Sequence, residues 1–155
     1  MSFFGRCFQQ FMVSKASPEQ LVEVLLPGWI PTNKDTRKAI ERSRLAERTL
    51  MAMPPASIKK SLISGMRSPD PHVRDACGHL LVNFVDTEVA NVMLDALSDQ
   101  NSWVRTHAAS FFAFNANPAQ LSNSEAIIVG LRRAISQEKE DKRKALLEEA
   151  LQRFL

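Results

Sequence analysis

Four charged residues in the first third of the chain are spaced to form one chemical surface. Arg37, Glu41, Arg44 and Arg48 stand at i, i+4, i+7 and i+11, so a helix over 36–52 brings them onto one face. A planar guanidinium can bind a carboxylate or a phosphate through two parallel hydrogen bonds. The face is either a solvated surface with an internal Arg–Glu pair or a binding surface. In the second case we expect Arg44 and Arg48 to contact an acidic or carbonyl-rich segment of a partner protein.

Aromatic residues offer apolar anchors for such a partner, because large rings are enriched among the residues that dominate interface energies. Trp103 stands just inside an expected helix, where burial against the neighbouring turn is the alternative to an exposed binding role. Phe111 shares a helical face with Val104 and is expected in the core. Phe112 shares a face with Arg105 and is expected to reach a binding surface.

Histidines and cysteines are too scattered to indicate a metal or catalytic site. His72, His79 and His107 belong to no HExxH or Cys–His cluster, and the glycines occur singly rather than in a phosphate-binding loop. We therefore expect no metal, no cofactor and no catalysis. Cys7 and Cys77 lie in apolar helical patterns, which predicts reduced thiols and a cytoplasmic protein.

Charge is segregated along the chain although the net charge is only +3. Residues 36–67 hold eight Lys or Arg and two Glu, whereas residues 68–99 hold one Arg and six acids. The basic block could follow a phosphate backbone, so binding of nucleic acid through residues 37–67 is an alternative to protein binding. The acidic segment argues against it, because it would repel the same polymer. The basic residues are Arg37, Lys38, Arg42, Arg44, Arg48, Lys59, Lys60 and Arg67.

Apolar residues recur at helical spacing throughout, which predicts an all-α fold without a membrane span. The expected helix starts are marked by N-cap residues at Ser17, Asp86, Asn101 or Ser102, and Ser124. Prolines fall only between the periodic segments. The segments are 3–13, 18–26, 36–52, 57–66, 71–84, 87–98, 102–115, 124–137 and 140–154, and the Phe-rich region 1–16 is expected to form an N-terminal capping helix.

An internal repeat is the strongest signal in the sequence. MRSPDPHVRDACGHLL from Met66 aligns with LSDQNSWVRTHAASFF from Leu97, which superposes Val104 on Val73 and Arg105 on Arg74. A looser first copy, DTRKAIERSRLAERTL, puts Arg37 in the same place as Arg74. A last copy, ISQEKEDKRKALLEEAL, puts Arg143 there.

This pattern of a turn with an acid, followed by Val-Arg and small residues, resembles the HEAT-like repeats, including the short bacterial form found in bilin lyases. The resemblance implies a single domain over residues 1–155, built as a short right-handed α-α superhelix of about four helical hairpins. It also implies that the repeated arginines, Arg37, Arg74, Arg105 and Arg143, brace the turns between helices through nearby acids and carbonyls.

The expected function is a non-catalytic protein-interaction module, such as an adaptor, assembly factor or inhibitory partner, that binds a protein segment on the concave face of the superhelix. Arg44, Arg48, Trp103 and Phe112 are its expected partner-binding residues. Besides binding of nucleic acid, the resemblance leaves open a bilin-lyase-type enzyme subunit, although the repeat alone does not carry that activity.

Overall fold

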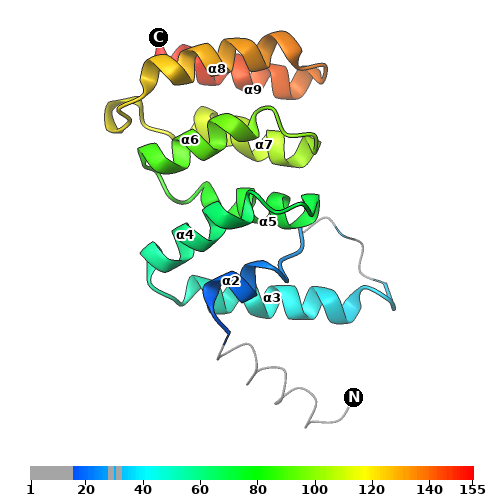
Figure 1. Cartoon of the computed structure of the whole chain (residues 1–155). Helices are drawn as coiled ribbons and strands as arrows, with labels where there is room; N and C mark the ends of the chain where they lie inside the picture. Colours follow the sequence, from blue (N-terminus) through cyan, green and yellow to red (C-terminus); the bar gives the residue numbers. More distant parts are fainter. Residues whose placement is uncertain (1–15, 28–29, 31–32) are drawn as a thin grey trace, which may run out of the picture. The chain divides into compact units, whose positions relative to one another are not determined.

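The computed structural model describes residues 16–27, 30 and 33–155, so the expected capping helix at residues 1–16 lies almost entirely outside the described residues. All regular secondary structure in this part of the chain is helical, and no strand occurs in it (Figure 1). The prediction of an all-α fold is confirmed for these residues. None of the described helices is long and apolar enough to cross a membrane.

The chain divides into two compact units, Met1–Cys77 and Gly78–Leu155. The first contains α2 (Pro18–Val22), α3 (Arg37–Met51), α4 (Pro55–Gly65) and the start of α5 (Pro71–Leu81), within which the boundary falls. The second contains the end of α5, then α6 (Thr87–Ala96), α7 (Ser102–Ser110), a π-helical turn η1 (Phe111–Asn115), a 3₁₀ turn η2 (Pro118–Gln120), α8 (Ser124–Gln137) and α9 (Asp141–Phe154).

In the first unit, the short helix α2 packs against both α3 and α4. The segment that follows α2 is also bound to α3, because the Ser43 hydroxyl accepts a hydrogen bond from the Leu26 backbone N at 2.8 Å. Gly65 allows α4 to pack closely against α2 and α5. A Cβ at this position would lie 2.6 Å from Val22 Cγ1 and would also overlap Cys77 Sγ. Cys77 is fully buried, and burial raises the pKa of its thiol to about 12, so this cysteine stays protonated and unreactive.

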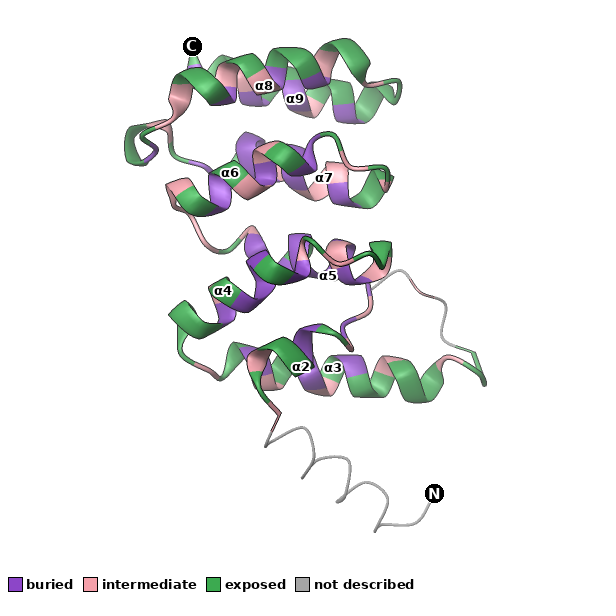
Figure 2. Cartoon of the chain, in the orientation of Figure 1, coloured by how far each residue is buried: buried purple, intermediate pink, exposed green. Residues whose placement is uncertain are grey.

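In the second unit, α6 packs beside α7 and α8 packs beside α9 (Figure 1). Buried residues lie on the facing sides of these helices, with exposed residues on the outer sides (Figure 2). This is the amphipathic pattern expected of helices that cover a common core. The largest fully buried side chains of the unit are Leu81, Val89, Met93, Val104, Phe111, Phe112, Ile127, Leu131 and Leu147.

Several predicted helix starts are confirmed by their capping bonds. Ser17 forms a capping box with Gln20, Asp86 accepts a hydrogen bond from the Val89 N, and Asn101 rather than Ser102 caps α7. At α8 the prediction is wrong by one residue, because Asn123 is the N-cap and Ser124 is the first helical residue.

The expected helix over 102–115 changes its winding at Phe111. The Ala116 N donates to the Phe111 carbonyl at 2.8 Å, a hydrogen bond that spans five residues and defines a π-helical turn. The end of this turn leaves carbonyls without helical partners. Arg153 of α9 satisfies them, since its guanidinium donates to the carbonyls of Phe112, Ala113 and Ala116.

Candidate partner-binding site

The internal repeat reappears in the hydrogen bonds that begin the second helix of each hairpin. The Asp70 side chain accepts from the His72 N at 2.8 Å, and the Asn101 side chain accepts from the Trp103 N at 2.8 Å. Two residues earlier, Ser68 and Asp99 accept hydrogen bonds from the backbone N of Asp70 and Asn101, respectively. The alignment of these two copies in the sequence therefore holds bond by bond.

Arg74 and Arg105 occupy the same place in these two copies and make the same contacts. Nη1 of Arg74 donates to the carbonyls of Ser68 and Pro69 at 2.8 and 3.2 Å. Nη1 of Arg105 donates to the carbonyls of Asp99 and Gln100 at 2.8 and 3.1 Å. Each guanidinium thus holds the turn that precedes its own helix.

Arg143 does not occupy this place, and the expected register of the last copy is wrong by one residue. The capping residue there is Glu140, whose side chain accepts from the Lys142 N at 3.1 Å as Asn101 does from Trp103. The Glu140 carbonyl accepts the first helical hydrogen bond from the Lys144 N, as the Asn101 carbonyl does from the Arg105 N. Lys144 is therefore the equivalent of Arg105.

In this register Arg143 takes the place of Val104, which is fully buried in the preceding copy. Arg143 is also buried, with only 7% of its surface exposed, so a cation stands where the repeat places an apolar side chain. Its guanidinium reaches back to α7, where Nη1 donates to the Ser102 carbonyl at 2.9 Å and to Thr106 Oγ1 at 2.7 Å. Arg143 thereby ties α9 to α7 instead of holding its own turn.

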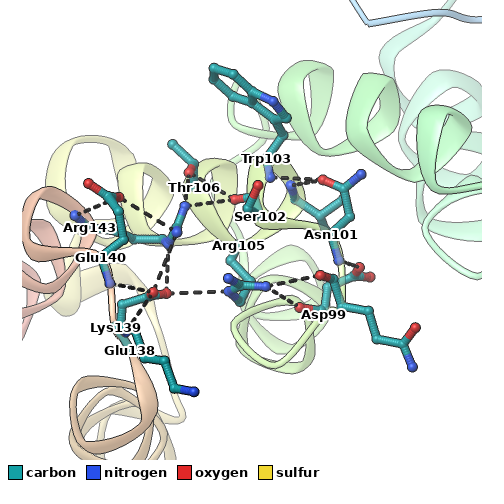
Figure 3. Close-up of polar contacts among 12 residues, drawn as sticks. Asp99, Asn101, Ser102, Trp103, Arg105, Thr106, Glu138, Lys139, Glu140 and Arg143 are labelled. Atoms are coloured by element: carbon teal, nitrogen blue, oxygen red, sulfur yellow. Dashed lines mark hydrogen bonds and ion pairs between the residues drawn. The ribbon is translucent and has the colours of Figure 1, made fainter.

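Glu138, in the turn between α8 and α9, balances this buried charge. Its Oε2 lies 2.6 Å from Arg143 Nε and 3.3 Å from Arg105 Nε, and its Oε1 accepts hydrogen bonds from the backbone N of Lys139 and Glu140 (Figure 3). The Arg143 hydrogen bond is the main cause that lowers the pKa of Glu138 from 4.5 to about 2. Glu138 stays ionised at neutral pH and joins the Arg105 turn to α9.

A cleft of about 480 Å³ opens above this network, between the N-terminal ends of α7 and α9. Trp103 forms one wall, with 47% of its surface exposed, and its ring projects away from the arginines and glutamates (Figure 3). The alternative in which Trp103 is buried against the neighbouring turn is therefore wrong. The remaining lining residues are Ser102, Thr106, Glu140, Lys142, Arg143 and Leu146.

Comparison with known proteins adds no relative to this picture. No family model matches the chain, and no curated protein matches it.

Phe112 does not reach a surface, contrary to the sequence-based expectation. It is fully buried, as Phe111 is, and its ring packs edge-on against Phe111 and against Phe154 of α9, with centroids 5.1 and 6.1 Å away. Phe114 instead points outward, with 60% of its surface exposed. Phe112 is therefore a core residue and is removed from the set of candidate partner contacts.

The charged stripe of α3 lies on the exposed side of that helix, opposite the buried residues Ser43, Ala46 and Leu50. Arg44 and Arg48 are exposed, and no hydrogen bond or ion pair is formed by either side chain within the described part of the chain. Arg37 is also exposed, and the Arg37 N donates to the Asn33 carbonyl, which places it in the repeat register of Arg74. The turn residues that Arg37 would hold, 31 and 32, lie outside the described residues.

The histidines form one pair rather than a ligand cluster. The rings of His79 and His107 lie 5.4 Å apart in a tilted arrangement. Within the described ranges, no three His, Cys, Asp or Glu side chains are grouped so that they could hold a metal ion.

Sequence reasoning overlooked Glu138 and Lys142, which belong to the α7–α9 site. The available signal was the capping residue. Aligning Glu140 with Asn101 places Glu138 on Asp99 and Lys142 on Trp103, whereas aligning arginine with arginine hides both matches.

Replacing Arg74 or Arg105 with Ala is expected to lower the free energy of unfolding by about 1–3 kcal/mol, because turn carbonyls lose charged hydrogen-bond donors. Chemical denaturation monitored by circular dichroism measures the loss. Lys144→Ala is the matched control, since Lys144 stands in the same register position but is exposed. Equal stability of the Arg105→Ala and Lys144→Ala variants would contradict a role for Arg105 in holding the turn.

Proposed function

We propose that the chain is a non-catalytic protein-interaction module whose hairpins stack into a short right-handed α-α superhelix of the HEAT-like type, and that the cleft between α7 and α9 binds a segment of a partner protein. The observation that carries the proposal is the half-exposed Trp103 at the wall of that cleft. Leaving a large apolar ring in water loses the free energy that its burial would provide, so exposed tryptophans mark contact surfaces.

The polar groups around Trp103 support a recognition role. Glu140 caps α9, Arg143 bonds to α7 and Glu138, and the Thr106 hydroxyl donates to the Ser102 carbonyl at 2.9 Å. These bonds fix the walls of the cleft before any ligand arrives. A preformed surface binds more tightly than a flexible one, because less conformational entropy is lost on association.

Trp103→Ala tests this proposal in the cell that makes the protein. Tagged wild-type and variant chains are crosslinked in living cells, and the attached proteins are quantified by mass spectrometry. We expect the variant to lose its specific protein partner by more than about tenfold, as for a hot-spot residue. Phe114→Ala, which removes another exposed ring away from the cleft, should keep the partner. Retention of every partner by Trp103→Ala would overturn the proposal.

Nucleic-acid binding through α3 is the second candidate, and the exposed Arg44 and Arg48 favour it. The charge reversals Arg44→Glu and Arg48→Glu separate the two functions. If α3 contributes to protein binding, the double variant keeps its helical content and weakens the native protein complex. The double variant could instead keep the protein complex and lose a salt-sensitive affinity for DNA or RNA. In that case nucleic-acid binding, not protein binding, is the function of the chain.

A further inference from the structure

The two residues that shape the open side of the α7–α9 cleft stand at the same position of consecutive repeats. Trp103 and Lys142 each donate their backbone N to the capping side chain that begins their helix, Asn101 and Glu140. The capping contacts are the same in each copy, but the residue at this position changes from an indole to an ammonium group. Constant architecture with a variable outward position is how helical repeats present different surfaces on one scaffold.

The ion pairs beside the cleft involve Arg105 and Arg143 but not Lys142. Glu138 pairs with Arg105 and Arg143, and Glu140 Oε2 lies 3.6 Å from Arg143 Nη2, so two carboxylates balance two guanidinium groups. Lys142 is exposed, and its ammonium group forms no hydrogen bond or ion pair with any residue that the structure describes. The cleft thus offers an indole face, the half-buried Leu146 and a single positive charge.

Resting on the function proposed above, we propose that this cleft binds an extended protein segment in which an apolar side chain lies next to a carboxylate. The apolar side chain packs between Trp103 and Leu146, and the carboxylate pairs with Lys142. This division of roles suits the chemistry, because the apolar contact supplies most of the affinity while the charge at the rim selects the partner.

A nucleic-acid strand fits the same surface less well. Binding to a phosphate backbone requires several cations in a row, and the neutral cluster beneath the cleft provides none beyond Lys142. Stacking of an unpaired base on the Trp103 ring is the one contact that such a strand could make. An oligothymidylate therefore serves as the competing probe.

Two-dimensional nitrogen–proton NMR of the full chain measures binding of three probes: a flexible peptide of repeated Gly-Leu-Asp, the same peptide with Asn in place of Asp, and the oligothymidylate. We expect the acidic peptide to shift the Trp103 indole and Lys142 amide resonances saturably. The Asn peptide should bind between about two- and fivefold more weakly, which is the effect of one ion pair at a rim. Tighter binding of the oligothymidylate, or no response to the acidic peptide, would overturn the proposal.

Lys142→Glu should weaken binding of the acidic peptide by at least about fivefold and leave binding of the Asn peptide unchanged. Lys144→Glu is the matched control, because Lys144 is exposed on the same helix but does not line the cleft. The two proposals fail separately. If Trp103→Ala loses the native partner while Lys142→Glu keeps both partner and peptide, the binding function stands and the acidic character of the ligand is wrong. If Trp103→Ala keeps the partner, the cleft is not the binding site.

Discussion

Replacing Glu138 with Gln is expected to lower the free energy of unfolding at neutral pH by about 3 kcal/mol. A drop in pKa from 4.5 to about 2 corresponds to this amount, at about 1.4 kcal/mol per pH unit. The carboxylate side chain is only 6% exposed, so water does little to screen the interaction. Gln would leave the buried Arg143 with only the exposed Glu140 carboxylate, 3.6 Å away, as a counter-charge, and losing the closer partner of a buried cation is costly.

The same residue predicts a distinct acid response. Because the folded-state pKa of Glu138 lies below its unfolded value, the folded state resists protonation, and the contribution to stability is full above about pH 5. It is then lost progressively as the pH falls toward the folded pKa of about 2. Wild-type and Glu138→Gln proteins should therefore differ most at neutral pH and converge in acid, as urea unfolding at a series of pH values would measure.

Two further variants make this prediction specific to the buried cluster. Glu148→Gln, on the exposed side of α9, removes a carboxylate and should leave stability within about 0.5 kcal/mol of wild type. Adding Arg143→Val to Glu138→Gln should recover part of the loss, because Arg143 stands in the register place of Val104 and the unpaired cation disappears. If the double variant is less stable than Glu138→Gln alone, Arg143 is not the partner that makes Glu138 important.

The parts of the fold that the sequence predicts are those set by local physics. Asp70 and Asn101 precede helical segments, and such side chains satisfy backbone N–H groups at helix starts, so their capping roles follow from residue type and position. The last repeat is harder, because a glutamate replaces the usual short capping residue at position 140. When the capping residue is not recognised, the alignment rests on residue type alone. It then matches Arg143 to Arg105, which is wrong by one residue.

The candidate site depends on contacts that sequence spacing does not fix. Glu138 and Arg105 are far apart in the chain, and their pairing requires the turn before α9 to lie against the turn before α7. Trp103 illustrates a second difficulty. Its apolar type favours burial, but a residue in the first turn of a helix can project beyond the neighbouring helices, and only the packed structure shows that it does.

The burial of Phe112 follows its place in the repeat rather than its phase on a helical wheel. A helical wheel with 3.6 residues per turn places Phe112 on the face of Arg105, two turns earlier. The π-helical turn begins only at Phe111, so its wider winding does not explain why Phe112 is buried. The repeat offers a better guide, since the alignment that superposes Arg105 on Arg74 also places Phe112 on the fully buried Leu81.

Phe112→Ala is therefore expected to cost about 3–5 kcal/mol of unfolding free energy, the usual range for deleting a fully buried aromatic ring and leaving a cavity. The ring lies between Phe111 and Phe154, so the change removes contacts within the π-helical turn and between that turn and the C-terminal end of α9. Arg153 holds the same turn through its carbonyls, which limits how far the chain can collapse to fill the cavity.

Phe114→Ala provides the matched comparison, because it deletes the same ring two residues later from a largely exposed position. Phe114→Ala should lower the free energy of unfolding by no more than about 0.5 kcal/mol. Chemical denaturation followed by circular dichroism measures both variants under one set of conditions. A binding residue would behave in the opposite way: its loss would spare stability and weaken a complex. If Phe112→Ala unfolds at the same denaturant concentration as wild type, the ring is not part of the core and its exposure in solution must be reconsidered. If Phe114→Ala is the more damaging change, the phase of the π-helical turn is reversed, and with it the assignment of which phenylalanine faces the core.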